Sequence, residues 1–135
     1  MEKILVREID SWAYMPREVY HGCYDLFLHN LTQLSEGWNM IPMGFFLEIP
    51  EGMGVLVQCS EENMMSGYFD EDGIEREIDI VPSFISSDDH REVCVSLYSH
   101  RECIMSAGTL IASMRVVSVP DVELVEGEDA SGRID

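Results

Sequence analysis

The chain has 135 residues, and 26 Asp and Glu against 8 Lys and Arg give it a formal net charge of −18 and a pI of about 4.3. This length suits one compact domain, and 46% hydrophobic residues are too many for a disordered acidic protein. The few, scattered basic residues argue against direct binding of nucleic acid or of an anionic membrane. Because the sequence lacks a membrane-span run and a signal-peptide core, we expect a cytoplasmic or nuclear protein that is not secreted.

Short apolar runs separated by turn residues follow one another along most of the chain. Such a pattern predicts an all-β sandwich or barrel. The expected strands are residues 3–6, 24–28, 40–41, 44–49, 55–59, 77–81, 93–98, 109–119 and 122–125. Residues 49–54, IPEGMG, predict a turn that joins two of these strands into a hairpin. One short helix is expected over residues 60–66, where Ser60 offers an N-cap.

The composition indicates no resident cofactor. The four cysteines form no CxxC pair and have no zinc-type spacing with the histidines, so we expect reduced cysteines that pack as small apolar groups. We expect residues 1–126 to form the domain and residues 127–135 to form a flexible acidic tail, because the tail is polar and has no aromatic side chain.

Four segments resemble motifs of the trimeric dUTPase family, in the family's order. Residues 22–26, GCYDL, are similar to its Ala-Gly-Tyr/Leu-Asp-Leu motif, and residues 41–52, IPMGFFLEIPEG, follow its Val-Pro-Thr-Gly-Leu-x-Ile-Glu-Leu-Pro-x-Gly motif. Residues 88–100, DDHREVCVSLYSH, are similar to Asp-Tyr-Arg-Gly-Glu-Ile-x-Val-x-Leu-x-Asn-His, with one residue fewer before Glu92. Residues 106–113, SAGTLIAS, resemble Glu-Arg-Gly-Asp-Arg-Ile-Ala-Gln.

The resemblance implies a dUTPase-like barrel of the β-clip or jelly-roll type that assembles as a homotrimer, with active sites between subunits. In an active enzyme, Asp25 would take the metal-associated position for Mg²⁺, and Asp88 would take the position of the residue that activates water. Asp70 and Asp89 are alternatives for the latter role. The resemblance places four residues at nucleotide-binding positions: His90, Ser60, Gly108 and Ser113.

The phosphate-binding part of the resemblance fails. The family's Arg-Ser-Gly falls on Ser60-Glu61-Glu62, so an arginine is replaced by a hydroxyl and two carboxylates follow it. An Arg–phosphate hydrogen bond contributes about 1.5–3 kcal/mol. Two like charges 4 Å apart repel by up to about 4 kcal/mol at an effective dielectric of 20. In addition, His90 stands in place of the tyrosine that packs under the deoxyribose, and Ser113 stands in place of glutamine. The residues therefore predict a retained scaffold without an ordinary triphosphate site.

Relative to the family, about ten residues are inserted at positions 66–75, in an acidic stretch. This stretch has two interpretations: a solvated hairpin kept soluble by its charge, or a surface that docks on a basic protein. The residues expected at such a partner-binding surface are Glu61, Glu62, Tyr68, Phe69, Asp70, Glu71 and Asp72.

The leading hypothesis is a catalytically degenerate dUTPase-like protein that acts by binding a protein partner. The alternative is a divergent, Mg²⁺-dependent dUTP or nucleotide pyrophosphatase that uses Asp25 and Asp88. Two further alternatives are an acidic mimic of nucleic acid and a protein that sequesters a nucleotide without hydrolysing it. Small acidic domains built on degenerate enzyme scaffolds are common in viral genomes, which suggests a viral source. This is an association and has no physical basis in the residues.

Overall fold

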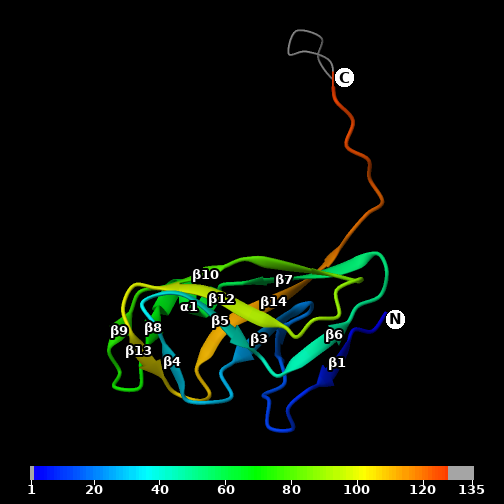
Figure 1. Ribbon diagram of the computed structural model, residues 1–135. Coiled ribbons are helices and arrows are strands. Elements are labelled where there is room, and N and C mark those ends of the chain that lie inside the picture. Colours follow the sequence, from blue (N-terminus) through cyan, green and yellow to red (C-terminus); the bar gives the residue numbers. More distant parts are fainter. Residues whose placement is uncertain (1, 128–135) are drawn as a thin grey trace.

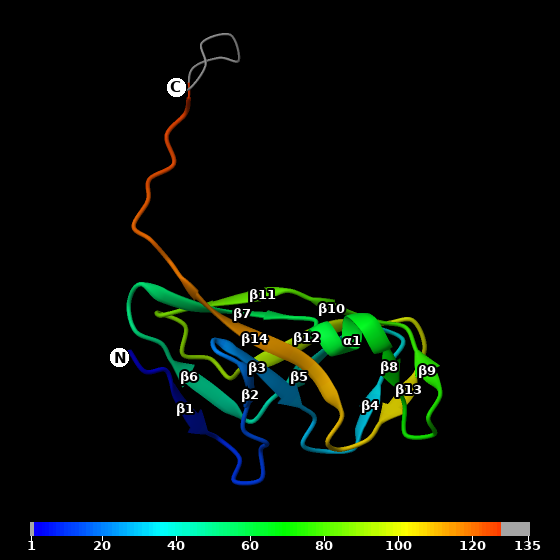
Figure 2. The same ribbon diagram turned by 180° about the vertical axis from the view of Figure 1, so that it is seen from behind.

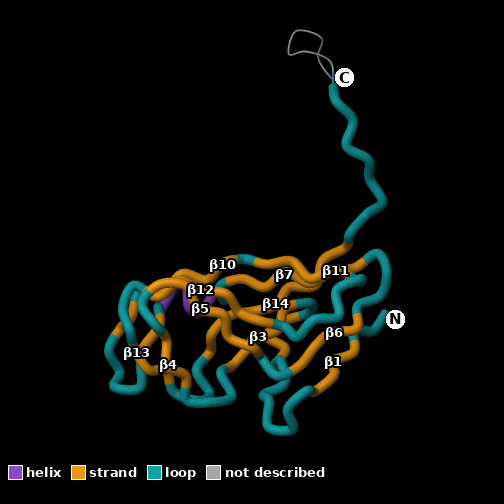
Figure 3. The backbone as a smooth tube through the Cα atoms, viewed as in Figure 1, coloured by secondary structure: helices purple, strands orange, loops and turns teal. Residues whose placement is uncertain are grey.

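The structure, a computed structural model, describes residues 2–127 and consists almost wholly of strands. Figure 1 shows the strands wrapped into one body, from which the C-terminal segment runs away after the last strand. Figure 3 colours the short helical segment purple, behind the strands. The strands are β1 (Leu5–Glu8), β2 (Arg17–Tyr20), β3 (Cys23–Phe27), β4 (Thr32–Leu34), β5 (Gly37–Pro42), β6 (Phe45–Glu48), β7 (Met53–Gln58), β8 (Tyr68–Phe69), β9 (Glu75–Arg76), β10 (Ile78–Val81), β11 (Ser83–Ser86), β12 (Cys94–Ser99), β13 (Cys103–Met105) and β14 (Leu110–Ser118); the helix is α1 (Glu61–Ser66).

Two larger sheets organise the domain, and all of their strand pairs are antiparallel. One has the order β11-β7-β14-β3-β2 and the other the order β10-β12-β5. Three two-stranded sheets, β1-β6, β13-β4 and β8-β9, complete the body. Figure 2, the view from behind, shows α1 beside β14 of the five-stranded sheet.

The core lies between these sheets because their strands alternate in burial. On β12, Val95 and Leu97 are fully buried, while the alternate residues Ser96 and Tyr98 face outward. Leu26 of β3, Val57 of β7 and Ile111 of β14 belong to the same buried cluster, as do Phe45 and Leu47 of β6. This is the pattern of antiparallel sheets that have one face on the core.

The predicted all-β class and the predicted helix are confirmed. Ser60 is the N-cap of α1, with its side chain accepting the N–H of Asn63. The inserted segment forms the β8–β9 hairpin, in which Tyr68 pairs with Arg76 and Phe69 with Glu75. Among the described residues, no helix is long and apolar enough to span a membrane.

Two predictions about the strands are wrong, one on pairing and one on the existence of a strand. The turn at 49–54 is present, with Gly52 at φ 87°, but it does not close a hairpin. Strand β6 pairs with β1, whereas β7 pairs with β14 and β11. Residues 122–125 form no strand, because the segment leaves the body and finds no neighbour to pair with. Most of the expected acidic tail, residues 128–135, lies outside the described residues.

Candidate functional site

A row of polar side chains crosses four strands of the five-stranded sheet. Asp25 on β3 has Arg17 of β2 as its register partner on one side and Ser113 of β14 on the other. Ser113 in turn faces Gln58 of β7. Register partners point to the same face of a sheet, so the sequence-predicted Asp25 and Ser113 are brought together. Arg17 was not predicted, because β2 is a short polar strand without an apolar pattern. Gln58 was not predicted as a site residue, although it lies in an expected strand.

Helix α1 begins directly beyond β7 and brings two carboxylates toward this row. Ser60, only 2% exposed, uses its hydroxyl locally: it donates to Asn63 Oδ1 at 2.6 Å and accepts the Asn63 N–H at 3.0 Å. The predicted nucleotide-binding hydroxyl is therefore occupied by the helix cap. The next two residues, Glu61 and Glu62, are exposed in the first turn.

Glu61 is bound by its neighbours on the sheet. Arg115 Nη2 donates to the Tyr20 hydroxyl at 2.7 Å, and that hydroxyl donates to Glu61 Oε1 at 2.8 Å. The Glu61 carboxylate raises the pKa of Tyr20 because it favours the protonated phenol that donates to it. The other arginine of the site, Arg17, lies over the Phe27 ring at 4.6 Å. Both arginines thus have partners within the chain.

Asp25 lies in an environment that favours its neutral form. Burial is the main cause that raises the pKa of Asp25, the negative charge of Glu62 raises it further, and Arg17 opposes both. Mg²⁺ commonly takes one or two carboxylates and keeps several waters. In residues 2–127, no three His, Cys, Asp or Glu side chains converge to hold a metal ion. Glu62 is the carboxylate whose charge acts on Asp25 at this site.

The predicted Asp88 and His90 lie at the other end of the domain from α1. They belong to the turn between β11 and β12, and Ser86 of β11 pairs with Gly54 near the start of β7, whereas α1 follows the end of β7. Gly54 and Gln58 are four residue steps apart along the strand, about 13 Å. A single chain therefore does not bring Asp88 and Asp25 into one site.

The turn that carries Asp88 is fixed by its neighbours. The guanidinium of Arg91 donates to Asp89 at 2.8 and 3.0 Å and, with the Arg91 N–H, lowers the pKa of Asp89 to about 2. Glu92 Oε2 accepts the N–H of Gly44 at 2.8 Å. Asp88, directly before this ion pair, and His90, between its two members, are exposed. Asp89 is thus held in a structural ion pair, while Asp88 is open to solvent.

Gly108 lies in the turn before β14, at the far end of the β3–β14 pair. Its φ of 84° is in the left-handed region, and its N–H donates to the Leu28 carbonyl at 2.6 Å. Tyr14 lies close to it, since a Cβ at this position would be 3.9 Å from the Tyr14 ring. Gly108 therefore sits beside an exposed aromatic loop and not beside α1.

The acidic surface expected around the insertion is narrower than the sequence predicts. Tyr68 is 4% exposed and donates its hydroxyl to the Ile111 carbonyl at 2.7 Å, so it is a core residue. Asp70 is 8% exposed and accepts the N–H groups of Asp72 and Ile74 and the guanidinium of Arg76. Because both side chains are buried, neither contributes to a contact surface. The other five expected residues are exposed. Together with three exposed apolar neighbours, Met64, Met65 and Ile74, they form what we call the acidic hairpin surface: Glu61, Glu62, Met64, Met65, Phe69, Glu71, Asp72 and Ile74.

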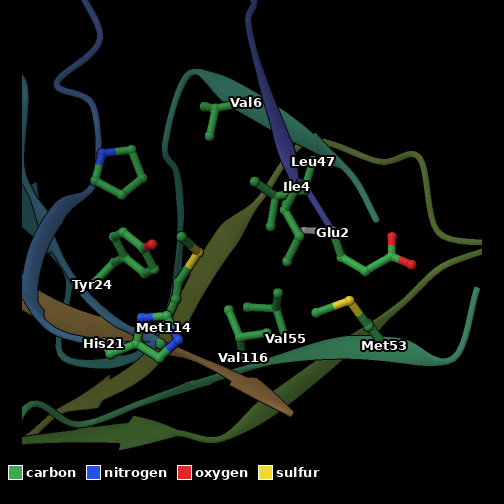
Figure 4. Close-up of a pocket in the computed structure, with 12 residues that line it drawn as sticks. Glu2, Ile4, Val6, His21, Tyr24, Leu47, Met53, Val55, Met114 and Val116 are labelled. Atoms are coloured by element: carbon green, nitrogen blue, oxygen red, sulfur yellow. The ribbon is translucent and has the colours of Figure 1, made fainter. Parts of the chain in front are cut away.

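An apolar cavity lies apart from both carboxylate positions. It has a volume of about 420 Å³ and is lined mainly by aliphatic and methionine side chains around β1, β6, β7 and β14. Figure 4 shows Ile4, Leu47, Val55 and Met114 converging on it. Tyr24 and Met114 line this cavity, whereas their strand neighbours Asp25 and Ser113 point to the opposite face of the sheet. The residues that line the cavity include no lysine or arginine that could neutralise a triphosphate.

Comparison with known structures identifies the fold. No family model matches the sequence, and no curated protein matches it. The structure is similar to the dUTPase of Staphylococcus aureus phage phi11, whose report describes a structural Mg(II) ion, with a TM-score of 0.75 and 16% identity over 96% of this chain and 99% of that one. It is also similar to the dUTPase of Staphylococcus bacteriophage 80alpha solved with dUpNHpp, with a TM-score of 0.74 and 15% identity over 96% of this chain and 100% of that one.

The chain therefore has the dUTPase fold over nearly its whole length. The resemblance carried by the four sequence motifs is confirmed at the level of the fold, and the low identity fits a divergent, dUTPase-like chain. Both neighbours are phage proteins.

Proposed function

We propose that this chain is a dUTPase-fold protein that has lost ordinary triphosphate binding and acts by binding a protein partner with a basic surface. The observation that carries the proposal is the first turn of α1. There the Ser60 hydroxyl is engaged by Asn63, and the next two residues are Glu61 and Glu62. A triphosphate entering this turn meets two carboxylates where it needs cationic or neutral donors.

The arginines beside α1 do not restore a phosphate cradle. Arg115 is held by Tyr20 and lies 3.8 Å from Glu61, and Arg17 lies over Phe27 opposite Asp25. Freeing either arginine for a phosphate costs the contact that it already makes. This adds to the repulsion from the two carboxylates.

The acidic hairpin surface supports a binding role. It combines exposed carboxylates with Met64 and Met65, which are 71% and 88% exposed, and with the half-exposed Phe69 and Ile74. Methionine and aromatic side chains beside charges are typical of adaptable protein contacts. The net charge of −18 would attract a basic partner over a long range at low salt. The report on the 80alpha protein states that phage dUTPases control transfer of virulence genes by a G protein-like mechanism.

We further propose that the chain assembles as a homotrimer in the cytoplasm or nucleus of its host. In the structure, Asp25 lies in the row that ends at Gln58, the last residue of β7, whereas Asp88 follows the end of β11 that pairs with the start of β7. Copies of the chain would therefore have to meet for Asp25 and Asp88 to share a site. This separation supports the trimer that the sequence resemblance implies.

The alternative is a working Mg²⁺-dependent nucleotide pyrophosphatase. It is favoured by the retained placement of Asp25 opposite Ser113 and by the likeness to a dUTPase solved with dUpNHpp. In that case Asp25 and Glu62 would hold Mg²⁺, which would polarise the phosphates, and Asp88 of a neighbouring copy would orient water. His90, Gly108 and Ser113 would then border the nucleotide.

One experiment separates the two functions. Purified protein is given dUTP with Mg²⁺, pyrophosphate release is followed, and binding of dUpNHpp is measured by calorimetry. The proposal expects no release above the buffer rate and no binding heat at millimolar ligand. Release at ordinary enzymatic rates that disappears in Asp88→Asn, with Asp72→Asn as a matched control on the hairpin, would overturn it.

A further inference from the structure

The outward face of the three-stranded sheet carries a row of aromatic and acidic side chains. Tyr98 of β12 has Asp79 of β10 as its register partner on one side and Trp38 of β5 on the other. In the next row, Ser96 lies between Val81 and Met40. We call these six residues the Trp38 face. Because Val95, Leu97 and Ser99 of β12 are buried, these alternate positions all point away from the core.

The Trp38 face holds two large apolar side chains that are mostly exposed to solvent. Trp38 is 73% exposed and Met40 is 70% exposed, next to each other on the same side of β5. Trp38 packs edge-to-face on Tyr98 at 4.9 Å, and Tyr98 packs edge-to-face on His100 at 5.0 Å. The rings hold one another in place, so binding a ligand would cost little side-chain conformational entropy.

Negative charge borders this aromatic ladder on one side. Asp79 Oδ2 lies 2.8 Å from His100 Nε2, and Glu77 Oε2 lies 3.6 Å from His100 Nδ1. Both carboxylates are still largely exposed, with side-chain exposures of 67% and 74%. Neighbouring strands are about 4.8 Å apart, so a cation placed over the Tyr98 ring is within reach of the Asp79 carboxylate. The face thus offers an aromatic platform, an adjacent anion and, beyond the platform, an apolar end at Met40.

We propose that the Trp38 face docks the partner protein through an arginine flanked by apolar side chains. The guanidinium lies over the Trp38–Tyr98 pair and contacts Asp79, while the apolar neighbours pack on Met40. Arginine fits better than lysine because its planar, weakly hydrated group stacks on aromatic rings and pairs with a carboxylate at once. The inference rests on the proposed function and deepens it: it assigns the central contact to Trp38, with the acidic hairpin surface as a long-range attractor.

The test uses the whole protein and two synthetic peptides, the acetylated heptapeptide Gly-Leu-Arg-Gly-Leu-Arg-Gly and its counterpart with lysine at both arginine positions. Trp12→Phe leaves Trp38 as the sole tryptophan, so its fluorescence reports on the face directly. The proposal expects saturable quenching by the arginine peptide and at least threefold weaker binding of the lysine peptide. Calorimetry should show that Trp38→Ala and Asp79→Asn each weaken arginine-peptide binding about tenfold, with partial rescue by Trp38→Phe.

The matched control removes charge elsewhere. Glu71→Gln with Asp72→Asn takes two negative charges from the hairpin and should change peptide affinity less than threefold at 0.15 M salt. An equal loss in this control and in Trp38→Ala would mean unspecific attraction and would overturn the inference. So would dissociation of an oligomer by Trp38→Ala, measured by mass-resolved light scattering, because a second copy would then cover the face.

The same samples keep the two proposals apart. If Trp38→Ala weakens peptide binding but the protein hydrolyses dUTP, the proposed function fails and the docking face stands as a contact of an enzyme. If dUTP is not hydrolysed and Trp38→Ala binds as the parent does, the docking inference alone fails. Unfolding midpoints of all variants should agree within about 2 °C, since Trp38 and Asp79 are exposed.

Discussion

Ser60 and Asn63 satisfy each other at the start of α1, and both are buried. The Ser60 hydroxyl donates to Asn63 Oδ1 and accepts from the Asn63 backbone N–H, and Asn63 Nδ2 donates to the Gly67 carbonyl at 3.3 Å. The pair therefore links the first turn of the helix to its last. This linkage holds Glu61 and Glu62 in place over the row that contains Asp25.

Ser60→Ala should destabilise the protein by about 1–2 kcal/mol. The substitution removes the N-cap, which typically contributes about 1 kcal/mol. It also leaves the backbone N–H and the Oδ1 atom of Asn63 without the Ser60 hydroxyl as their partner. Urea unfolding followed by circular dichroism measures the change. Ser66→Ala, an exposed position at the end of the same helix, is the control and should stay within about 0.5 kcal/mol of the parent. Equal losses in the two variants would contradict the role of the cap.

The helix was predictable from sequence because its signals are local. Ser60 followed by two acids and then Asn63 is a cap pattern that depends on a few neighbouring residues. The same holds for the turn at Gly52. Strand partners depend on residues far away, so the pattern around Gly52 could not show that β6 pairs with β1 and β7 with β14.

The candidate site was predictable only in part, for the same reason. Asp25 and Ser113 were found through motif resemblance, and the structure places them opposite each other. Arg17 and Tyr20 were missed because β2 has no apolar alternation, and its four residues are all exposed. Tyr68 and Asp70 were assigned to the surface from composition, but one packs in the core and the other closes a turn with three hydrogen bonds.

Glu61→Gln should lower the pKa of Tyr20. The phenol donates to the Glu61 carboxylate, which raises the pKa of Tyr20, and a neutral amide supports the protonated phenol less strongly. The titration can be followed by NMR of the tyrosine ring carbons. Tyr68 is the internal control, because burial and Cys59 raise its pKa independently of Glu61. An unchanged Tyr20 titration, or a parallel shift of Tyr68, would contradict the hydrogen bond.

Asp70 should make the stability of the protein sensitive to acid. The N–H of Ile74, the guanidinium of Arg76 and the N–H of Asp72 lower the pKa of Asp70 below its unfolded value near 4. A depressed folded pKa adds stability that is present above pH 4 and is lost as the pH falls below it. Asp70→Asn should therefore lower the urea midpoint at pH 7 and have less effect at pH 2.5.

Asp72→Asn is the control for the acid effect, since Asp72 is exposed on the same turn. Its urea midpoint should follow that of the parent at both pH values. If the penalty of Asp70→Asn is the same at pH 7 and at pH 2.5, the ionised carboxylate is not what stabilises the hairpin.

Glu61→Gln combined with Glu62→Gln should give the protein measurable affinity for a triphosphate. The two amides keep the Ser60–Asn63 cap, remove two negative charges from the first turn of α1 and release Arg115 from its contact with Glu61. Calorimetric titration with dUpNHpp and Mg²⁺ should show binding at least tenfold tighter than in the parent, which corresponds to about 1.4 kcal/mol. Glu71→Gln with Asp72→Asn makes the same change of charge on the β8–β9 turn and should leave affinity at the parent level. A gain of equal size in this control would assign the effect to net charge, and no gain in either variant would show that the carboxylates of α1 are not what excludes the triphosphate.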